Sequence, residues 1–381
     1  MDHRIYLDYC ATTPVHPGVR NQLLIAMEVD FGNPSSMHWA GVEARKLVDQ
    51  AREEVANGIG ALPEELLFTS GATEADNLAL FGTLHRFAPQ KAHLITSSIE
   101  HHAILHATDR LEQEGYSITR LPVDKHGLLN PEDVRRAIRS ETKLISVIYV
   151  NNEVGCIQPV AEIGRIAREN NILFHTDAVQ AVGLFDVNVQ DRNVDLLSLS
   201  GHKIYGPKGI GALYVRSGVE LMPMIVGGPQ ERLLRAGTEN VPGIVGLAAA
   251  MSLVREKRAE ERIRLSELKE YLIQGLQAAC PGAIVNGLEN AVAPHILSIS
   301  FPGVDAEMML IRLNNEGIAV SLGSACNSKS IEPSHVLTAM GLPSEQIDST
   351  LRFSLGMHTT RDELEIVLGA VERILPRVKV H

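Results

Sequence analysis

The chain has 381 residues, 45% of them hydrophobic, and a formal net charge of −11 at pH 7. This composition is typical of a globular protein with one large and one smaller domain, and it argues against disorder. The negative charge argues against a nucleic-acid backbone as the main ligand. No apolar run reaches membrane-spanning length, and the first residues do not resemble a signal peptide. The four cysteines form no CxxC pair, which fits a reducing compartment, so we expect a cytoplasmic protein without membrane contact.

The first half of the chain alternates between predicted strands and predicted helices. We expect strands at 5–8, 66–69, 93–96, 116–121, 143–150 and 172–176, and helices at 41–58, 75–87, 131–139 and 160–170. Uninterrupted apolar strands that alternate with helices predict a mainly parallel sheet covered on both faces. Ligands of such sheets bind beyond the carboxyl ends of the strands, so polar residues at those ends are candidates for a site.

A candidate anion site follows the strand at 66–69. Ser70-Gly71-Ala72-Thr73-Glu74 leads directly into the next helix. Free backbone N–H groups and the helix dipole favour an anion at such a helix start, and Thr73 adds a hydroxyl group. The alternative is a capped helix that binds nothing.

Three histidines follow the strand at 93–96. His102 and His106 are four residues apart, so they could share a helix face and a metal ion. The stretch has no HExxH pattern and no cysteine pair nearby, and we therefore predict no metal site. A ring placed just after a strand equally suits stacking on a planar cofactor.

Two polar clusters follow the next two strands. Asn151-Asn152-Glu153 follows the strand at 143–150, and the stretch from Asp177 to Gln180 follows the strand at 172–176. An aspartate that emerges from an apolar strand is expected to be partly buried, where its charge requires a cationic partner. A protonated pyridine nitrogen would be such a partner.

The stretch Ser200-Gly201-His202-Lys203 follows an apolar run at 194–199 and precedes a glycine-rich turn and a strand at 212–215. A lysine on such a rigid loop is suited to losing its proton and forming a Schiff base with an aldehyde. Ser200 and His202 could bind the anionic end of that aldehyde cofactor. The alternative is an ordinary surface lysine in a glycine-rich loop.

The last third of the chain predicts a smaller α/β unit after a long helix at 242–279. We expect strands at 296–301, 318–322 and 351–355, and helices at 306–314, 333–340 and 361–375. Cys326 lies in a loop of small polar residues, where a thiol is more often reactive than structural. Arg352 lies within a short strand, which a carboxylate ligand would explain, with a buried ion pair as the alternative.

These stretches together resemble cysteine desulfurases of the NifS/IscS branch, within the class-V aminotransferase family of pyridoxal-phosphate enzymes of fold type I. The most specific matches are Ser200-Gly201-His202-Lys203 and Gly323-Ser324-Ala325-Cys326. The resemblance implies a seven-stranded-type, mainly parallel sheet covered by helices and a smaller C-terminal α/β domain. We expect residues 13–255 to form the large cofactor-binding domain. Residues 1–12 and 256–381 would form the small domain that carries the cysteine loop.

The resemblance also implies roles for individual residues. Lys203 would bind the cofactor covalently, Cys326 would receive the sulfur as a persulfide, and His101 would stack on the ring. The other expected cofactor contacts are Asp177 at the ring nitrogen, Gln180 at the ring oxygen, and Ala72, Thr73, Ser200, His202 and Thr238 at the phosphate, Thr238 from the other subunit of a homodimer. Asn152 and Arg352 would bind the carboxylate of the substrate, L-cysteine.

The expected function is therefore transfer of sulfur from L-cysteine, with release of L-alanine, to an acceptor such as an iron–sulfur scaffold protein. A selenocysteine lyase or another class-V enzyme on the same fold remains an alternative. A non-catalytic sulfur carrier or scaffold-binding protein is a further alternative, which the intact set of Lys203, Asp177 and His101 argues against. Cys10 stands where relatives commonly have Asn, Ser or Ala, and we interpret it as a small buried filler rather than a second sulfur-handling thiol.

Overall fold

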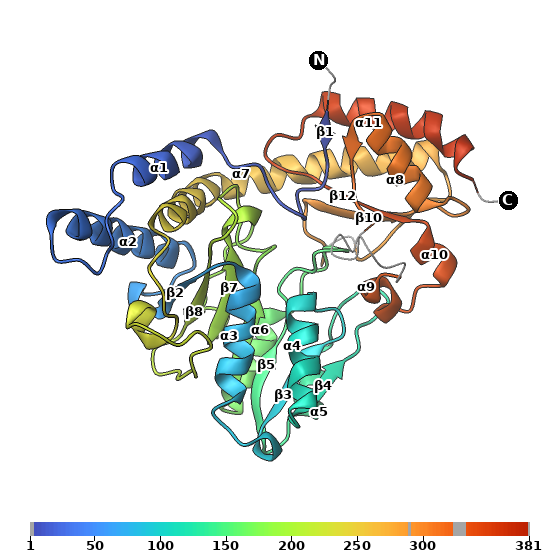
Figure 1. Ribbon diagram of the computed structural model, residues 1–381. Helices are drawn as coiled ribbons and strands as arrows, with labels where there is room; N and C mark the ends of the chain where they lie inside the picture. Colours follow the sequence, from blue (N-terminus) through green and yellow to red (C-terminus); the bar gives the residue numbers. More distant parts are fainter. Residues whose placement is uncertain (1–3, 289–290, 323–332, 380–381) are drawn as a thin grey trace.

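The computed structural model describes residues 4–288, 291–322 and 333–379 (Figure 1). Its largest sheet has seven strands in the order β2-β8-β7-β6-β5-β3-β4. The strands are β2 (Leu66–Thr69), β3 (His93–Ser97), β4 (Ser117–Leu121), β5 (Thr142–Ser146), β6 (Leu173–Asp177), β7 (Leu196–Ser200) and β8 (Gly211–Val215). Strands β4, β3, β5, β6 and β7 pair in parallel, whereas β8 is antiparallel to both β7 and β2. The expected mainly parallel sheet is thus confirmed.

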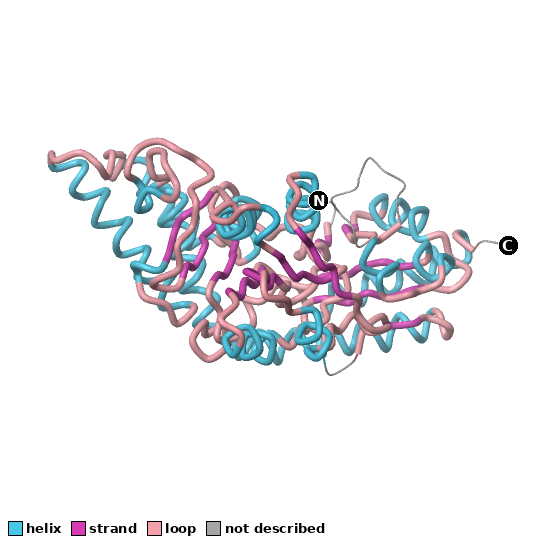
Figure 2. The backbone as a smooth tube through the Cα atoms, turned by 90° about the horizontal axis from the view of Figure 1, so that it is seen from below, coloured by secondary structure: helices cyan, strands magenta, loops and turns pink. Residues whose placement is uncertain are grey.

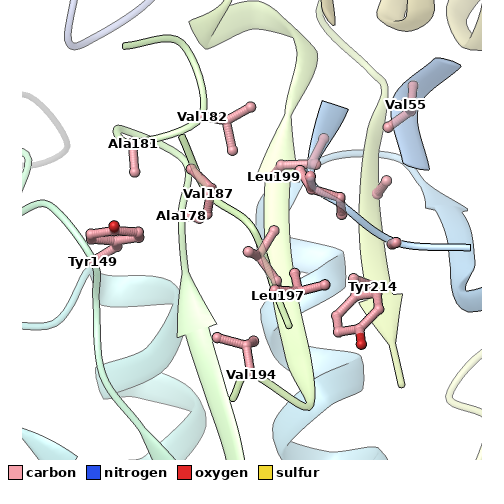
Figure 3. Packing of buried hydrophobic residues seen from close by; sticks show 14 of the residues in the cluster. Val55, Tyr149, Ala178, Ala181, Val182, Val187, Val194, Leu197, Leu199 and Tyr214 are labelled. Carbon is pink, nitrogen blue, oxygen red and sulfur yellow. The ribbon is translucent and has the colours of Figure 1, made fainter. Parts of the chain in front are cut away.

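Helices cover both faces of this sheet because successive strand residues point to opposite sides. Leu94, Leu144 and Leu196 pack on one side with α3 (Ala72–Leu84) and α4 (His102–Gln113). Their chain neighbours Ile95, Ile145 and Leu197 pack on the other side. Helices α2 (Trp39–Gly58), α5 (Pro131–Ala137), α6 (Val160–Glu169) and the first part of α7 (Val241–Ala279) cover that second face. Figure 3 shows buried side chains of this core, among them Val55 of α2 and Leu197 and Leu199 of β7.

A smaller unit is built around the C-terminal part of the chain. Its antiparallel sheet has the order β12-β10-β9, from β9 (Ile284–Val285), β10 (Ile296–Ser300) and β12 (Thr350–Ser354). The N-terminal strand β1 (Ile5–Tyr6) returns to this unit and pairs in parallel with β11 (Ile318–Ala319). The unit also contains α8 (Ala306–Asn315), α9 (His335–Ala339), α10 (Ser344–Asp348) and α11 (Arg361–Ile374). Figure 2 shows the strands of the large and the small unit within one elongated molecule.

Helix α7 joins the two units in a single run of 39 residues. Its first part, from Ile244 to Val254, packs in the core of the large sheet. Its last part, from Leu265 to Leu276, packs with Leu7, Phe301 and their neighbours in the core of the small unit. None of the helices in the described ranges combines the length and the apolar character needed to cross a bilayer.

Helices α4 and α10 lie outside the helix ranges expected from the sequence, and so does α1 (Pro17–Glu28). Its N-cap is His16, whose Nδ1 accepts a hydrogen bond from the N–H of Gly18. Only Val19 and Ala26 of this helix are buried, whereas Leu24, Ile25 and Met27 are exposed. Apolar residues on both sides of the helix obscure the period by which an amphipathic helix is recognised.

Candidate active site

A cavity of about 630 Å³ lies where strands β6 and β7 of the large sheet end and the small unit begins. Its wall contains ten of the residues selected from the sequence: Ala72, Thr73, His101, Asn152, Asp177, Gln180, Ser200, His202, Lys203 and Arg352. These residues come from segments separated by up to 280 positions, and the sheet topology is what brings them together.

Lys203 lies at the end of a short 3-10 turn, Gly201–Lys203, directly after β7. Its ammonium group donates hydrogen bonds to the backbone carbonyls of Cys10 and Ala11. The loop is tightly closed, since a side chain on Gly206 would meet the carbonyl oxygen of Gly201 at 2.8 Å. The chain therefore holds the amine in a fixed position at the cavity wall.

Asp177 is the last residue of β6 and is 5% exposed. Burial raises the pKa of its carboxyl group to about 6, against the opposing effects of the Val179 N–H and of Lys203. Its Oδ1 accepts the Val179 N–H at 3.0 Å. A positively charged group in the cavity would favour the ionised form of this carboxyl group.

Gln180 follows one turn later and is held by two contacts. Its Nε2 donates to the carbonyl of Cys10 at 3.0 Å, and its Oε1 lies 3.4 Å from Nε2 of His295 in the small unit. Cys10 itself is fully buried, and burial raises the pKa of its thiol. This environment supports the interpretation of Cys10 as a small filler.

His101 is the N-cap of α4, and its Nδ1 accepts the N–H of Ala103 at 3.1 Å. Burial and the nearby Lys203 ammonium lower the pKa of His101 to about 4. The ring is therefore neutral near pH 7. Its position at the cavity wall, fixed by the cap, is compatible with stacking on a planar ligand.

The N-terminus of α3 provides the anion end of the cavity. Its N-cap is Gly71, and no side chain caps the helix there. The wall next to it contains Ser200 and His202, whose Nδ1 lies 3.2 Å from the hydroxyl oxygen of Thr12. Uncapped N–H groups and hydroxyls together form a typical phosphate site.

Arg352, in the middle of β12, is 2% exposed. Its guanidinium donates to the carbonyl of Asn152 and to Oδ1 of Asp8, both at 2.7 Å. The buried ion pair that the sequence left open is thus present, and Arg352 nevertheless lies at the cavity wall. A carboxylate contact by Arg352 remains a prediction.

Two expected site residues are not among those that line the cavity in the described part of the chain. Thr238 is exposed and does not line the cavity. Cys326, the expected sulfur acceptor, lies outside the described residues. The sequence reading also missed Asp8 and Asp76, whose importance depends on contacts between distant segments. Within the described ranges, no group of three His, Cys, Asp or Glu side chains could hold a metal ion.

The aminotransferase class-V family model matches residues 5–367. The chain belongs to this family. It is 45% identical over 379 residues to the cysteine desulfurase IscS of Dictyoglomus turgidum, covering 100% of this chain and 96% of that protein. It is 47% identical over 375 residues to the IscS of Methanosarcina thermophila, covering 98% and 93%.

The comparison with solved structures agrees with the sequence relatives. A NifS-like protein superposes with a TM-score of 0.93 at 37% identity, covering 99% of this chain and 100% of that one. The structure described as SspA in complex with cysteine gives a TM-score of 0.80 at 39% identity, covering 93% and 100%. The resemblance inferred from the motifs is confirmed, and the chain is a pyridoxal-phosphate enzyme of fold type I.

The residues of the cavity fit pyridoxal phosphate. A lysine amine, a buried carboxyl group and an uncapped helix start lie around one cavity. They match the aldehyde, the ring nitrogen and the phosphate of the cofactor respectively. When bound, the cofactor supplies an electron-withdrawing ring that makes bonds at the substrate α-carbon easier to break.

Proposed function

We propose that this enzyme is a cysteine desulfurase that converts L-cysteine to L-alanine and passes the sulfur to Cys326. The observation that carries the proposal is the single cavity that unites Lys203, Asp177 and His101 with Arg352. The cysteine desulfurases that align over nearly its whole length support the same reaction.

The chain's own residues have distinct tasks in this proposal. Arg352 and Asn152 bind and orient the substrate carboxylate at the small-unit side of the cavity. Lys203, once its amine is released, moves protons to and from substrate carbons. His101 packs on the ring and Asp177 holds the proton of the ring nitrogen. Thr73, Ser200 and His202 bind the phosphate.

The sulfur step balances without an external oxidant. The Cys326 thiolate attacks the substrate sulfur, an S–S bond forms and the C–S bond breaks. The substrate carbon receives a proton, so that alanine leaves and Cys326 carries a persulfide. A reductant or an acceptor protein, such as an iron–sulfur scaffold, then removes the sulfur. We place this chemistry in the cytoplasm.

We also propose that the enzyme is a homodimer. The segment from α1 to the start of α2 exposes several large apolar side chains, among them Phe31 at 70%, Met37 at 99% and Trp39 at 73%. Several large exposed apolar side chains in one segment are typical of an interface. Thr238 is exposed on a loop that packs on α2 through the Arg45–Glu239 ion pair. That position suits a phosphate contact in the other subunit.

We also propose that residues 13–255 form the large domain and that residues 1–12 and 256–381 form the small one. The hydrophobic core of the small unit supports this division, since it gathers Ile5 and Leu7 together with C-terminal residues such as Leu265, Phe301 and Val378.

The function is tested by separating the steps of the reaction. Wild-type protein treated with cysteine alone should carry extra sulfur on the Cys326 peptide in mass spectrometry. Cys326→Ser should retain the cofactor, trapped by borohydride on the Lys203 peptide, yet release no sulfide with reductant. Cys280→Ser, on a partly exposed thiol at the end of α7, is the control and should keep full activity.

Extra sulfur on Cys10, or full activity in Cys326→Ser with cysteine, would contradict the mechanism. Activity of Cys326→Ser with selenocysteine alone would favour the selenocysteine lyase alternative.

A further inference from the structure

Three carboxyl groups are buried close to one another beside the cavity. Asp76 on α3 is 1% exposed, Glu100 after β3 is 0% exposed and Asp177 is 5% exposed. Asp76 and Asp177 both line the cavity. Like charges in a buried space strongly disfavour joint ionisation. The proposed reaction gives a task to Asp177 only.

Asp76 and Asp177 differ in their surroundings. Asp177 accepts the Val179 N–H, and the Lys203 ammonium favours its charged form. Neither oxygen of Asp76 has a hydrogen-bond partner of acceptable geometry within the described part of the chain. Burial and the Asp177 charge raise the pKa of Asp76 well above its usual range, and the Ser198 hydroxyl opposes this rise.

His175 is the nearest potential cation, with its Nε2 at 3.6 Å from Oδ1 of Asp76. Its Nδ1 lies 2.8 Å from Oγ of Ser146, and its Nε2 lies 3.0 Å from Oγ of Ser198. A neutral imidazole has one donor and one acceptor, and the two serines satisfy both. Burial lowers the pKa of His175 to about 3, so this ring supplies no positive charge to Asp76.

Glu100 does not neutralise a negative charge on Asp76 either. Its Oε1 accepts hydrogen bonds from the Ser97 hydroxyl and, at 3.0 Å, from the N–H of Ile148. Burial raises the pKa of Glu100 to about 8. The titratable groups that act on or contact Asp76 are Asp177 and Glu100, together with His175 at 3.6 Å. Lys203, His101 and Glu74 line the same cavity.

We propose that Asp76 is a positioning residue whose carboxyl group stays protonated, so that Asp177 keeps the negative charge that faces the cofactor ring. The proposal rests on the assignment of Asp177 to the ring nitrogen. With Asp76 neutral, its carboxyl group adds no second negative charge beside Asp177, and the charge of Asp177 is available to the ring nitrogen.

The first test uses the protein without cofactor. A folded-state pKa above the unfolded value means that stability is lost as pH rises above the unfolded value of about 3.9, until the folded pKa is reached. Asp76→Asn mimics the neutral acid and does not titrate. Its unfolding temperature should therefore exceed that of wild type by a margin that grows between pH 5 and pH 8.

Two variants serve as controls. The unfolding temperature of Glu100→Gln should also exceed that of wild type by an amount that grows with pH. Comparison of the two variants separates the contribution of Glu100 from that of Asp76. Asp195 accepts the N–H of Phe174 and pairs with Arg216, so Asp195→Asn should lose stability at pH 7. An Asp76→Asn margin that is constant with pH, or a loss of stability at pH 8, would overturn the proposal.

The second test uses the loaded enzyme and the wild-type chain. Asp76→Asn should bind pyridoxal phosphate within about threefold of wild type, and a loss beyond tenfold would show that an ionised Asp76 is required. If the variant fails to fold, wild-type protein with ¹³C-labelled aspartate carboxyls should show one protonated side chain above pH 7. Complete ionisation of the aspartates there would refute the proposal. The unfolding measurement is made without cysteine and without cofactor. Its result is therefore independent of the outcome of the desulfurase assay.

Discussion

At the scale of a single residue, Arg352 forms a buried ion pair and is also the proposed contact for the substrate carboxylate. It is almost fully buried, and its contact with Asp8 raises the question whether it serves folding or substrate binding. Loss of a charged bidentate contact to the substrate carboxylate weakens substrate binding on the order of tenfold to a hundredfold. Arg352→Ala should therefore raise the half-saturating cysteine concentration by that factor in steady-state kinetics.

Asp8→Asn is the matched control for Arg352→Ala. It weakens the ion pair but leaves the guanidinium in place, so its half-saturating cysteine concentration should stay within about threefold of wild type. Equal effects of both variants on unfolding, with no change in the cysteine dependence, would make Arg352 a purely structural residue.

Residues that follow strands directly were predictable from the sequence, and those paired across the fold were not. Lys203 and Asp177 stand at the ends of apolar strands, where parallel sheets bind ligands, so their location in the cavity was expected. Asp8 contacts Arg352 across 344 positions of the chain. Such contacts depend on the packing of the small unit, which residue spacing does not encode.

At the scale of elements, the loop before α7 depends on one buried ion pair. Glu231, Arg232 and Leu233 all have positive φ angles, which costs backbone energy in non-glycine residues. Arg52 of α2 holds this loop by a bidentate contact to Glu231, and the Phe68 N–H donates to the same carboxylate.

Removal of Arg52 should be strongly destabilising. The side chains of Arg52 and Glu231 are 14% and 4% exposed, so Arg52→Met leaves a buried carboxylate without its cation. We expect a loss of about 3 kcal/mol in urea unfolding. The exposed pair Arg165–Glu169 offers the control, and Arg165→Met should cost less than about 1 kcal/mol. Similar losses in both variants would refute this role of Arg52.

The elements themselves were largely predictable, with informative exceptions. The alternation of apolar strands and helices predicted the mainly parallel sheet, because burial on both faces requires continuous apolar strands. The antiparallel direction of β8 and the existence of α1 were not indicated. A five-residue strand carries no signal of its direction, and the exposed apolar side chains of α1 obscure its period.

At the scale of the whole molecule, the exposed apolar residues around α2 predict a dimer. Trp39→Asp places a charge on this surface, so it should convert the dimer to a monomer in sedimentation, with little effect on folding of the subunit. Ile263→Asp is the control, since Ile263 is 64% exposed on α7 and lies outside the segment from α1 to the start of α2. It should leave the dimer intact.

A second experiment tests whether each active site contains residues from both subunits. Inactive Lys203→Ala chains mixed with inactive Thr238→Ala chains should recover part of the activity, because one of the mixed sites has both residues intact. A wild-type monomer with full activity would disprove the dimer and the shared sites.

Helix α7 also connects the core of the large unit to the core of the small unit. A straight helix of 39 residues is about 58 Å long, so a tilt of about three degrees around its midpoint moves each end by roughly 1.5 Å. Near its start, Gly246 packs against Pro207 and Ala250 against Gly206, within the loop that follows Lys203. Its other end lies in the core of the small unit. The helix thus connects the packing of the C-terminal unit directly to the loop that follows the reactive amine.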